Sequence, residues 1–457
     1  AIHAVNEDVD ERIATQDINK ASVVSIPVVD WYDFGINASD ELEEVENKSH
    51  SWSSRPYVGL DFRYIYTLNF PFTFDGSSIN EFLLGINDES DGKIDGKGSD
   101  YFSITLQKSS FSSGKQMTSR TKVAFMRADA ERNYKPRTYH KDDAQLFGYF
   151  PAERDFIKNQ ENDRRGDVAK YRNISRFNPE RKVLEFRFSD DSTHDPRIRG
   201  LGLKAVKAWQ EAFAKAGVNT KFELRMDPSS DVGLGDLRYN IINFVESVSV
   251  TGLIGVGPSV VDPFTGEIIA STANIQLSSI RGVYTSFIRH YIRSQLGVFD
   301  KNYLCIKDRK SSELTVDVAL GTDARQNCNT FEKVAAPLVT KLNRICPEIK
   351  PFIAKYKSTI KSLEDLVSHR AAIDPTDELA SIKPCVEKMS EDMIVSSLVH
   401  ELGHNLGLRH NFRGSTDQPN FWSKNHTDGE SVESSAVMEY LSPYREELTK
   451  PGKYEVA

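Results

Sequence analysis

The feature that most constrains the fold is a cluster of histidines near the end of the chain. Three of the ten histidines, His400, His404 and His410, lie in the string HELGHNLGLRH. The residues from Ser390 onward have the apolar spacing of a helix, and Ser390 is a suitable N-cap. Residues four apart project from the same side of a helix, and Gly407 can take the left-handed conformation that ends it. The segment therefore predicts a helix whose tail turns back and brings three imidazoles together.

Three converging imidazoles are the ligand set of a catalytic zinc ion, which needs three protein ligands and one open position. Glu401 follows the first histidine, so its carboxylate can take the proton of a water activated by the metal. The pattern predicts one Zn²⁺ ion bound by His400, His404 and His410, and hydrolytic chemistry. Histidines on a plain surface helix are the alternative. The glycine and the third histidine at fixed offsets argue against that alternative.

Two segments carry a family resemblance. Residues 400–415 (HELGHNLGLRHNFRGS) and 434–440 (SSAVMEY) resemble the metzincin clan of zinc metalloproteases. The wider chain is similar to large bacterial zinc-dependent metalloproteases, in which a β-rich N-terminal region precedes the catalytic domain. Further matching stretches are WSSRPYVGLDF (52–62), AWQEAFAKAG (208–217), DLRYNIINFV (236–245) and VVDPFTGEII (260–269). Asn411 departs from the residues that follow the third histidine in the well-studied metzincins, so the chain matches none of those families.

The resemblance implies roles for two residues of the SSAVMEY segment. Met438 would form the apolar floor beneath the zinc histidines, as in the Met-turn of metzincins. Tyr440 would lie beside the zinc and stabilise the oxyanion, as a tyrosine at this offset does in astacins and serralysins. Judged alone, a methionine or a tyrosine in such a run is more often a core residue, and a packed core role for Tyr440 stays open.

The resemblance also implies a twisted mixed sheet of five strands, one edge of which pairs with extended peptide substrates. The predicted edge strand covers residues 268–277, and its candidate substrate-binding residues are Ile268, Ala270, Thr272 and Asn274. The preceding Asp-Pro-Phe-Thr-Gly segment predicts a hairpin turn. The chain ends 19 residues after Met438, where the similar proteins continue, which predicts a truncated or cleaved product.

The pattern of strand-like and helical segments predicts an α+β fold. A length of 457 residues exceeds one ordinary domain and predicts two. Residues 1–190 are predicted to form a β-rich N-terminal domain, with strand-like runs at 23–29, 62–72, 101–106 and 183–188. Residues 191–457 are predicted to form a metzincin-like catalytic domain. Its first elements are a helix at 203–216 that ends at Gly217 and strands at 221–226 and 237–245. Residues from about 300 to 390 have a helical pattern and predict an inserted helical subdomain.

All four cysteines lie in or near this insertion: Cys305, Cys328, Cys346 and Cys385. None belongs to a CxxC pair, which argues against a zinc knuckle. Two disulfides fit better and predict a location outside the cytoplasm. Of the three possible pairings, the sequential one, Cys305–Cys328 with Cys346–Cys385, is favoured. Four free buried thiols are the alternative.

Composition limits the partners. A formal net charge of −8 gives no reason to expect a nucleic acid, and no stretch approaches the roughly 18 apolar residues of a membrane span. We expect a protein or peptide substrate, and the sequence predicts no oligomeric state. The expected location is extracytoplasmic (secreted, periplasmic or cell-surface), and the resemblance implies a bacterial source.

Three functions fit a zinc site of this kind. The first is an endopeptidase that uses Glu401 as general base. The second is a latent or non-catalytic zinc-binding protein, although the intact Glu401 argues against a pseudoenzyme. The third is a zinc amidase that acts on a non-protein substrate with the same chemistry.

Overall fold

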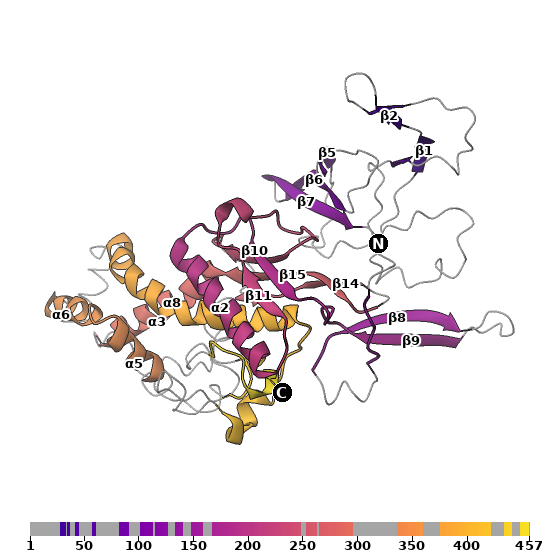
Figure 1. The fold of residues 1–457 in the computed structure, drawn as a ribbon. Coiled ribbons are helices and arrows are strands. Elements are labelled where there is room, and N and C mark those ends of the chain that lie inside the picture. The colour runs from indigo at the N-terminus through magenta and orange to yellow at the C-terminus, as the bar shows by residue number, and fades with distance from the viewer. Residues whose placement is uncertain are drawn as a thin grey trace.

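The structure is a computed structural model that describes part of the chain. The described residues are 28–32, 34–36, 42–44, 57–60, 82–90, 101–112, 115–126, 133–139, 148–158, 167–247, 253–262, 265–295, 336–359, 375–421, 434–440 and 448–456. Within them the chain forms a mixed α/β fold, in which helices pack against one large sheet and several small antiparallel sheets are added (Figure 1).

The large sheet is mixed, with the strand order β11-β10-β12-β15-β13 and with β14 also paired to β15. Its strands are β10 (Val183–Phe188), β11 (Lys221–Leu224), β12 (Asn240–Val245), β13 (Gly255–Val256), β14 (Ser259–Val261) and β15 (Ile268–Gln276). β10, β11, β12 and β15 run parallel, whereas the short β13 and β14 are antiparallel to β15. Strand β12 is almost wholly buried, as expected for a central parallel strand with an unbroken apolar sequence.

The main helices pack against one another beside this sheet (Figure 1). They are α2 (Pro196–Lys215), α3 (Leu277–Gln295), α5 (Ala336–Ile345), α6 (Ile349–Thr359), α8 (Pro375–Asn405) and α9 (Lys453–Val456), with short 3₁₀ turns at η4 (Pro228–Ser230), η7 (Gly414–Thr416) and η8 (Gln418–Asn420). Helix α2 begins where Asp195 accepts a hydrogen bond from the Arg197 N–H, and Gly217 follows its end with a φ of +73°. Its buried Trp209 donates a hydrogen bond to the Val399 carbonyl of α8 at 2.9 Å, which joins the two helices through the core.

Helix α8 begins earlier than predicted, so the N-cap assigned to Ser390 is wrong. Ser390 is fully buried in the middle of the helix, and its hydroxyl donates to the Val386 carbonyl at 2.6 Å. A bond to the carbonyl four residues earlier satisfies a serine inside a helix, so the residue type alone does not mark a helix start.

The predicted domain boundary at residue 190 is also wrong. Strand β10 precedes it in sequence, yet lies between β11 and β12 in the large sheet. The sequence texture changes near residue 190 because α2 begins at Pro196, one element after the first strand of this sheet.

Before β10 the described residues form small antiparallel sheets. Their strands are β1 (Val28–Tyr32), β2 (Phe34–Ile36), β3 (Leu42–Glu44), β4 (Tyr57–Leu60), β5 (Phe82–Ser90), β6 (Tyr101–Ser112), β7 (Lys115–Met126), β8 (Pro151–Lys158) and β9 (Asp167–Ile174). They pair as β1-β4, β2-β3, β5-β6-β7 and β8-β9. The predicted run at 62–72 lies outside the described residues. That this region is a separate domain stays a prediction.

The predicted insertion is described at residues 336–359 and 375–390, where α5, α6 and the first part of α8 lie. Cys346 and Cys385 form a disulfide with a Cα–Cα distance of 5.6 Å, which is one of the two favoured pairs. Cys305 and Cys328 lie outside the described residues, and the insertion as a separate subdomain stays a prediction. None of the described helices has the length and apolar character needed to cross a membrane.

Candidate metal centre

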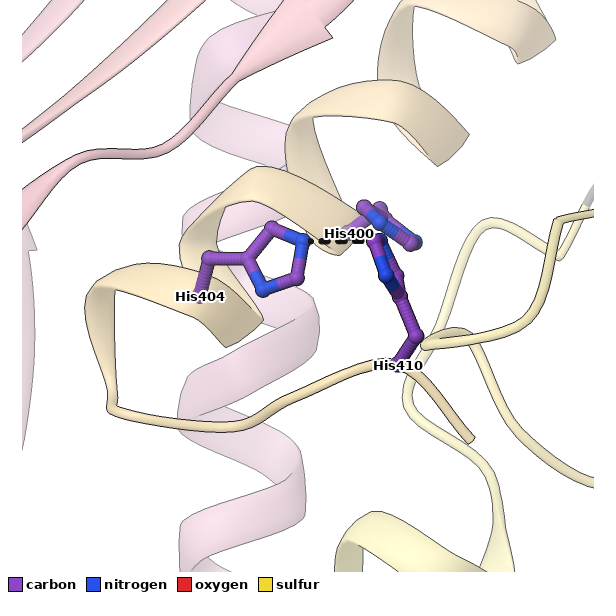
Figure 2. A group of neighbouring side chains, drawn as sticks. All are labelled: His400, His404 and His410. Atoms are coloured by element: carbon purple, nitrogen blue, oxygen red, sulfur yellow. Dashed lines mark hydrogen bonds between the residues drawn. The ribbon is translucent and has the colours of Figure 1, made fainter. Parts of the chain in front are cut away.

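Three imidazoles converge at the end of α8. His400 and His404 project from the last turns of the helix, and His410 reaches back from the loop that follows (Figure 2). One nitrogen from each ring lies within 4.8 Å of the other two. The Nε2 atoms of His404 and His410 are 3.2 Å apart. The sequence-predicted ligands therefore come together at one point.

The other nitrogen of two of these rings is held by the backbone. His400 Nδ1 donates to the Val437 carbonyl at 2.7 Å, and His404 Nδ1 donates to the Leu408 carbonyl at 2.8 Å. Such bonds fix the ring orientation and leave the Nε2 lone pairs free for a metal. Burial, together with neighbouring imidazoles, lowers the pKa of His400 and of His410 to about 4. Burial likewise lowers the pKa of His404, so all three rings are neutral at pH 7.

The geometry fits a zinc ion. Two nitrogens bound at about 2.0–2.1 Å to a tetrahedral zinc are about 3.3 Å apart, close to the 3.2 Å between His404 and His410. Three neutral imidazoles, two of them with Nδ1 bonded to a backbone carbonyl, are also donor chemistry that zinc prefers. His400, His404 and His410 would hold the ion.

The turn after α8 directs His410 back to the other two histidines. Gly407 has a φ of +94°, the left-handed conformation expected from the sequence. Its N–H donates to the His404 carbonyl, and the Leu408 N–H donates to the Gly403 carbonyl at 3.0 Å. This pair of bonds is a Schellman motif, which ends a helix at a left-handed glycine.

Residues 148–150, which lie far upstream in the sequence, form backbone hydrogen bonds with this turn. The Phe150 N–H donates to the Gly407 carbonyl at 2.7 Å, and the Arg409 N–H donates to the Gly148 carbonyl at 2.5 Å. A Cβ added at Gly407 would overlap the carbonyl oxygen of Ser175, which presses against the turn. Sequence reasoning missed residues 148–150 and Ser175, because nothing in their residue types indicates a contact with the metal-binding loop.

Glu401 lies against the edge of the large sheet. A Cβ added at Gly255 would be 2.7 Å from Glu401 Oε1, and one at Gly257 would overlap the Glu401 carbonyl oxygen. The edge strand therefore passes directly over the carboxylate, which only glycines allow. Burial raises the pKa of Glu401 to about 8. The buried Asn405 ties the same elements together, since its side-chain amide donates to the Thr272 carbonyl at 3.1 Å.

The predicted substrate edge at residues 268–277 is wrong. Strand β15, which carries Ile268, Ala270, Thr272 and Asn274, pairs with β12 on one side and with β13 and β14 on the other. A strand with neighbours on both sides has no free backbone groups for a peptide. The edge is formed by β13 and β14, and β14 directly precedes the predicted Asp-Pro-Phe-Thr-Gly turn.

Met438 is fully buried below α8, where its sulfur occupies the space that a side chain at Gly403 would need. The Met438 carbonyl accepts a hydrogen bond from the Asn411 N–H at 2.8 Å, which links this segment to the loop that carries His410. Glu455 supports the segment from below, since its carboxylate accepts bonds from the Met438 N–H at 3.4 Å and the Gly452 N–H at 2.6 Å. Sequence reasoning missed Glu455.

Tyr440 lies at the open side of the histidine cluster. Its ring centroid is 4.2 Å from that of His410 and 5.8 Å from that of His400. Two phenylalanines also contact the histidines: the ring centroid of Phe412 is 5.5 Å from that of His410, and the centroid of Phe150 is 5.6 Å from that of His404. Neither phenylalanine was singled out from the sequence. Burial, with a smaller contribution from Glu401, raises the pKa of Tyr440, so its hydroxyl keeps its proton at neutral pH.

Comparison with protein families identifies the same segment. Residues 383–450, which span the three histidines, Glu401 and the segment of Met438, match the model of a family described as Met-zincin. No curated protein and no solved structure matches the chain. The family match and the histidine cluster agree in pointing to a zinc site of the HExxH type and to metalloprotease-type function.

Proposed function

We propose that the chain is a zinc-dependent endopeptidase in which Glu401 is the general base. The observation that carries this proposal is the convergence of three neutral imidazoles next to Glu401, a buried residue of α8. A glutamate one residue after the first histidine ligand acts as the general base in zinc sites of the HExxH type.

Each residue has a distinct task in the proposed reaction. A bound zinc ion supplies Lewis-acid chemistry, which polarises a carbonyl group and makes water a better nucleophile at neutral pH. Glu401 accepts the proton of the attacking water and passes it to the nitrogen of the leaving amine. Gly255 and Gly257 leave room for Glu401 to lie directly against the sheet edge, because a side chain at either position would overlap it.

Tyr440 is proposed to stabilise the charge that develops on the carbonyl oxygen. Its ring is close to His410 and its hydroxyl is protonated at neutral pH, so it can donate a hydrogen bond in the transition state.

The substrate is proposed to be an extended peptide that pairs with β13 and β14. Among the described residues both strands pair with β15 alone, so their outer backbone groups face away from the sheet. An added strand at such an edge is a common mode of peptide recognition. It would place the peptide backbone next to Glu401, because Gly255 and Gly257 contact this residue.

Substitution of Glu401 by Gln tests the mechanism. The variant keeps all three histidines, so metal analysis should find the zinc content of the wild type. Digestion of an unbiased peptide library should fall by roughly 10²–10⁴-fold, because the proton acceptor is lost. Cleavage at the wild-type rate by the purified variant would reject Glu401 as the base, and a zinc-loaded wild type that cleaves no peptide would reject the peptidase.

An extracytoplasmic location is proposed from the cysteines. The Cys346–Cys385 disulfide joins the end of α5 to α8, and such bonds persist in oxidising compartments. Mass mapping of the native protein without reductant should find Cys346 linked to Cys385 and Cys305 linked to Cys328. Four cysteines that react with an alkylating reagent in the native protein would refute this location.

A further inference from the structure

Exposed apolar side chains gather around the metal centre. In the described part of the chain, Tyr440 at 66% and Phe412 at 63% are the large apolar side chains most exposed to solvent, and Phe150 is 41% exposed. All three contact a metal-binding histidine. Exposure of large apolar groups is costly in water, and a concentration of them at one site marks a surface that binds another apolar group.

Backbone hydrogen bonds hold Phe150 itself and the residues on either side of Phe412. Phe150 donates its N–H to the Gly407 carbonyl, and its own carbonyl accepts from the Ser175 N–H at 2.8 Å. Phe412 lies in the loop between Asn411, whose N–H is bonded to the Met438 carbonyl, and Gly414, whose N–H is bonded to the Asn411 carbonyl. Their rings contact different histidines, Phe150 beside His404 and Phe412 beside His410.

The sheet edge carries two further exposed apolar side chains. Val256 and Val260 are each 48% exposed, and they lie opposite Asn274 and Ala270 of β15. Cross-strand partners lie on the same face of a sheet, and residues four apart in a strand share a face. The two valines therefore lie on one face of the edge, whereas Gly255 and Gly257 lie against Glu401. A peptide that pairs with this edge would place alternate side chains beside the valines.

We infer that the substrates are apolar polypeptide segments, with large apolar side chains next to the scissile bond in contact with Phe150 and Phe412. This inference rests on the proposed function, since it assigns a substrate class to the same site. Segments of this composition are buried in folded proteins, so the protein would act on unfolded or unassembled polypeptides rather than on exposed polar loops.

Binding to the full-length Glu401→Gln variant tests the substrate class without cleavage. The probes are two fluorescent peptides of equal length and net charge, one with Phe and Leu at the variable positions and one with Ser and Asn. With the zinc-loaded variant, we expect the apolar peptide to bind at least about tenfold more tightly, because each apolar side chain buried against an aromatic ring adds to affinity.

Substitutions in the same background locate the contacts. Phe412→Ser, and independently Phe150→Ser, should each reduce the difference between the two peptides by about three- to tenfold. Val256→Thr keeps the shape of the edge side chain and should reduce the difference by a smaller factor. Met226→Ser is the matched control, since Met226 is exposed and lies outside the site; it should leave the difference unchanged.

Equal affinity for both peptides would overturn the inference, as would a difference that survives both phenylalanine substitutions. Circular dichroism and zinc content show whether each variant is folded, and Phe412→Ser is decisive if Phe150→Ser disturbs the turn. Tight apolar binding by Glu401→Gln combined with no hydrolysis by the wild type would reject the peptidase and leave the apolar binding surface standing.

Discussion

The metal-binding segment and the parts that support it differ in how they are encoded. His400, Glu401, His404 and His410 come from eleven consecutive residues, and the helix and its terminal glycine bring them together locally. Their supports come from residues 148–150, 255–258 and 452–455, which are distant in sequence. The ligand set is therefore a local property of the chain, whereas the orientation of each ligand depends on the assembled fold.

The largest effect is expected where the two regions touch at Gly407. Gly407→Ala would force a side chain into a left-handed φ of +94° and against the carbonyl oxygen of Ser175. Strain and overlap together should lower the free energy of unfolding by about 3–5 kcal/mol. Chemical denaturation measures this loss, and zinc titration should show weaker binding because His410 is displaced.

Gly217→Ala is the matched control for Gly407→Ala. Gly217 has a φ of +73°, but no heavy atom lies within 4 Å of an added Cβ. This substitution should cost only about 1 kcal/mol and leave zinc affinity unchanged. Equal losses for the two variants would mean that Ser175 does not support the turn. The orientation of His410 would then not depend on this distant residue.

The next largest effect concerns the support of Glu401 by the edge strand. In Gly257→Ala, the added methyl group would press on the Glu401 carbonyl oxygen and lie 3.0 Å from the His404 Cβ. A shift of the general base by about 1 Å can lower kcat by roughly 10²-fold. Steady-state kinetics should show this loss mainly in kcat, with zinc content close to that of the wild type.

Gly200→Ala controls for the loss of a glycine elsewhere in the protein. Gly200 lies on α2, and an added Cβ would meet no atom within 4 Å. Alanine favours the helix, so stability should rise slightly and kcat should not change. If Gly257→Ala keeps the kcat of the wild type, the edge strand does not position Glu401.

The sequence predicted elements whose signal is local. Strand β10 at residues 183–188 and helix α2 with its Gly217 stop follow from apolar periodicity and a helix-ending glycine. The predicted edge strand was wrong because strand order depends on pairing across the sheet, which the sequence of β15 alone does not reveal. β13 and β14 are too short to give a periodic signal.

The residues of the site fall into two groups, those that the sequence alone identifies and those that only the fold identifies. The histidines, Glu401 and Gly407 could be named because their spacing carries the chemistry. Phe150, Gly257 and Glu455 could not, because an isolated phenylalanine, glycine or glutamate is compatible with many environments. Their roles follow only from what the fold places beside them, such as the carboxylate beside Gly257 and the Met438 N–H beside Glu455.

The smallest effect concerns Glu455, which supports the Met438 segment from a buried position. Burial raises its pKa from 4.5 to about 7, against the smaller lowering effect of its hydrogen bonds to backbone N–H groups. Between these two values the folded protein keeps a proton that the unfolded chain has released. The stability due to the protonated form is therefore fully present below pH 4.5 and is lost as the pH rises through about 7.

Glu455→Gln should remove this loss because glutamine does not titrate. Relative to the wild type, the variant should gain about 2 kcal/mol of stability between pH 5 and pH 8. Urea denaturation of the metal-free proteins at both pH values measures the change, and the titration of the histidines cancels because both proteins share them. A difference between the two proteins that does not vary with pH would show that Glu455 is ionised throughout this range. Its support of the Met438 segment would then come from a charged carboxylate, and this distant support would not weaken as the pH rises.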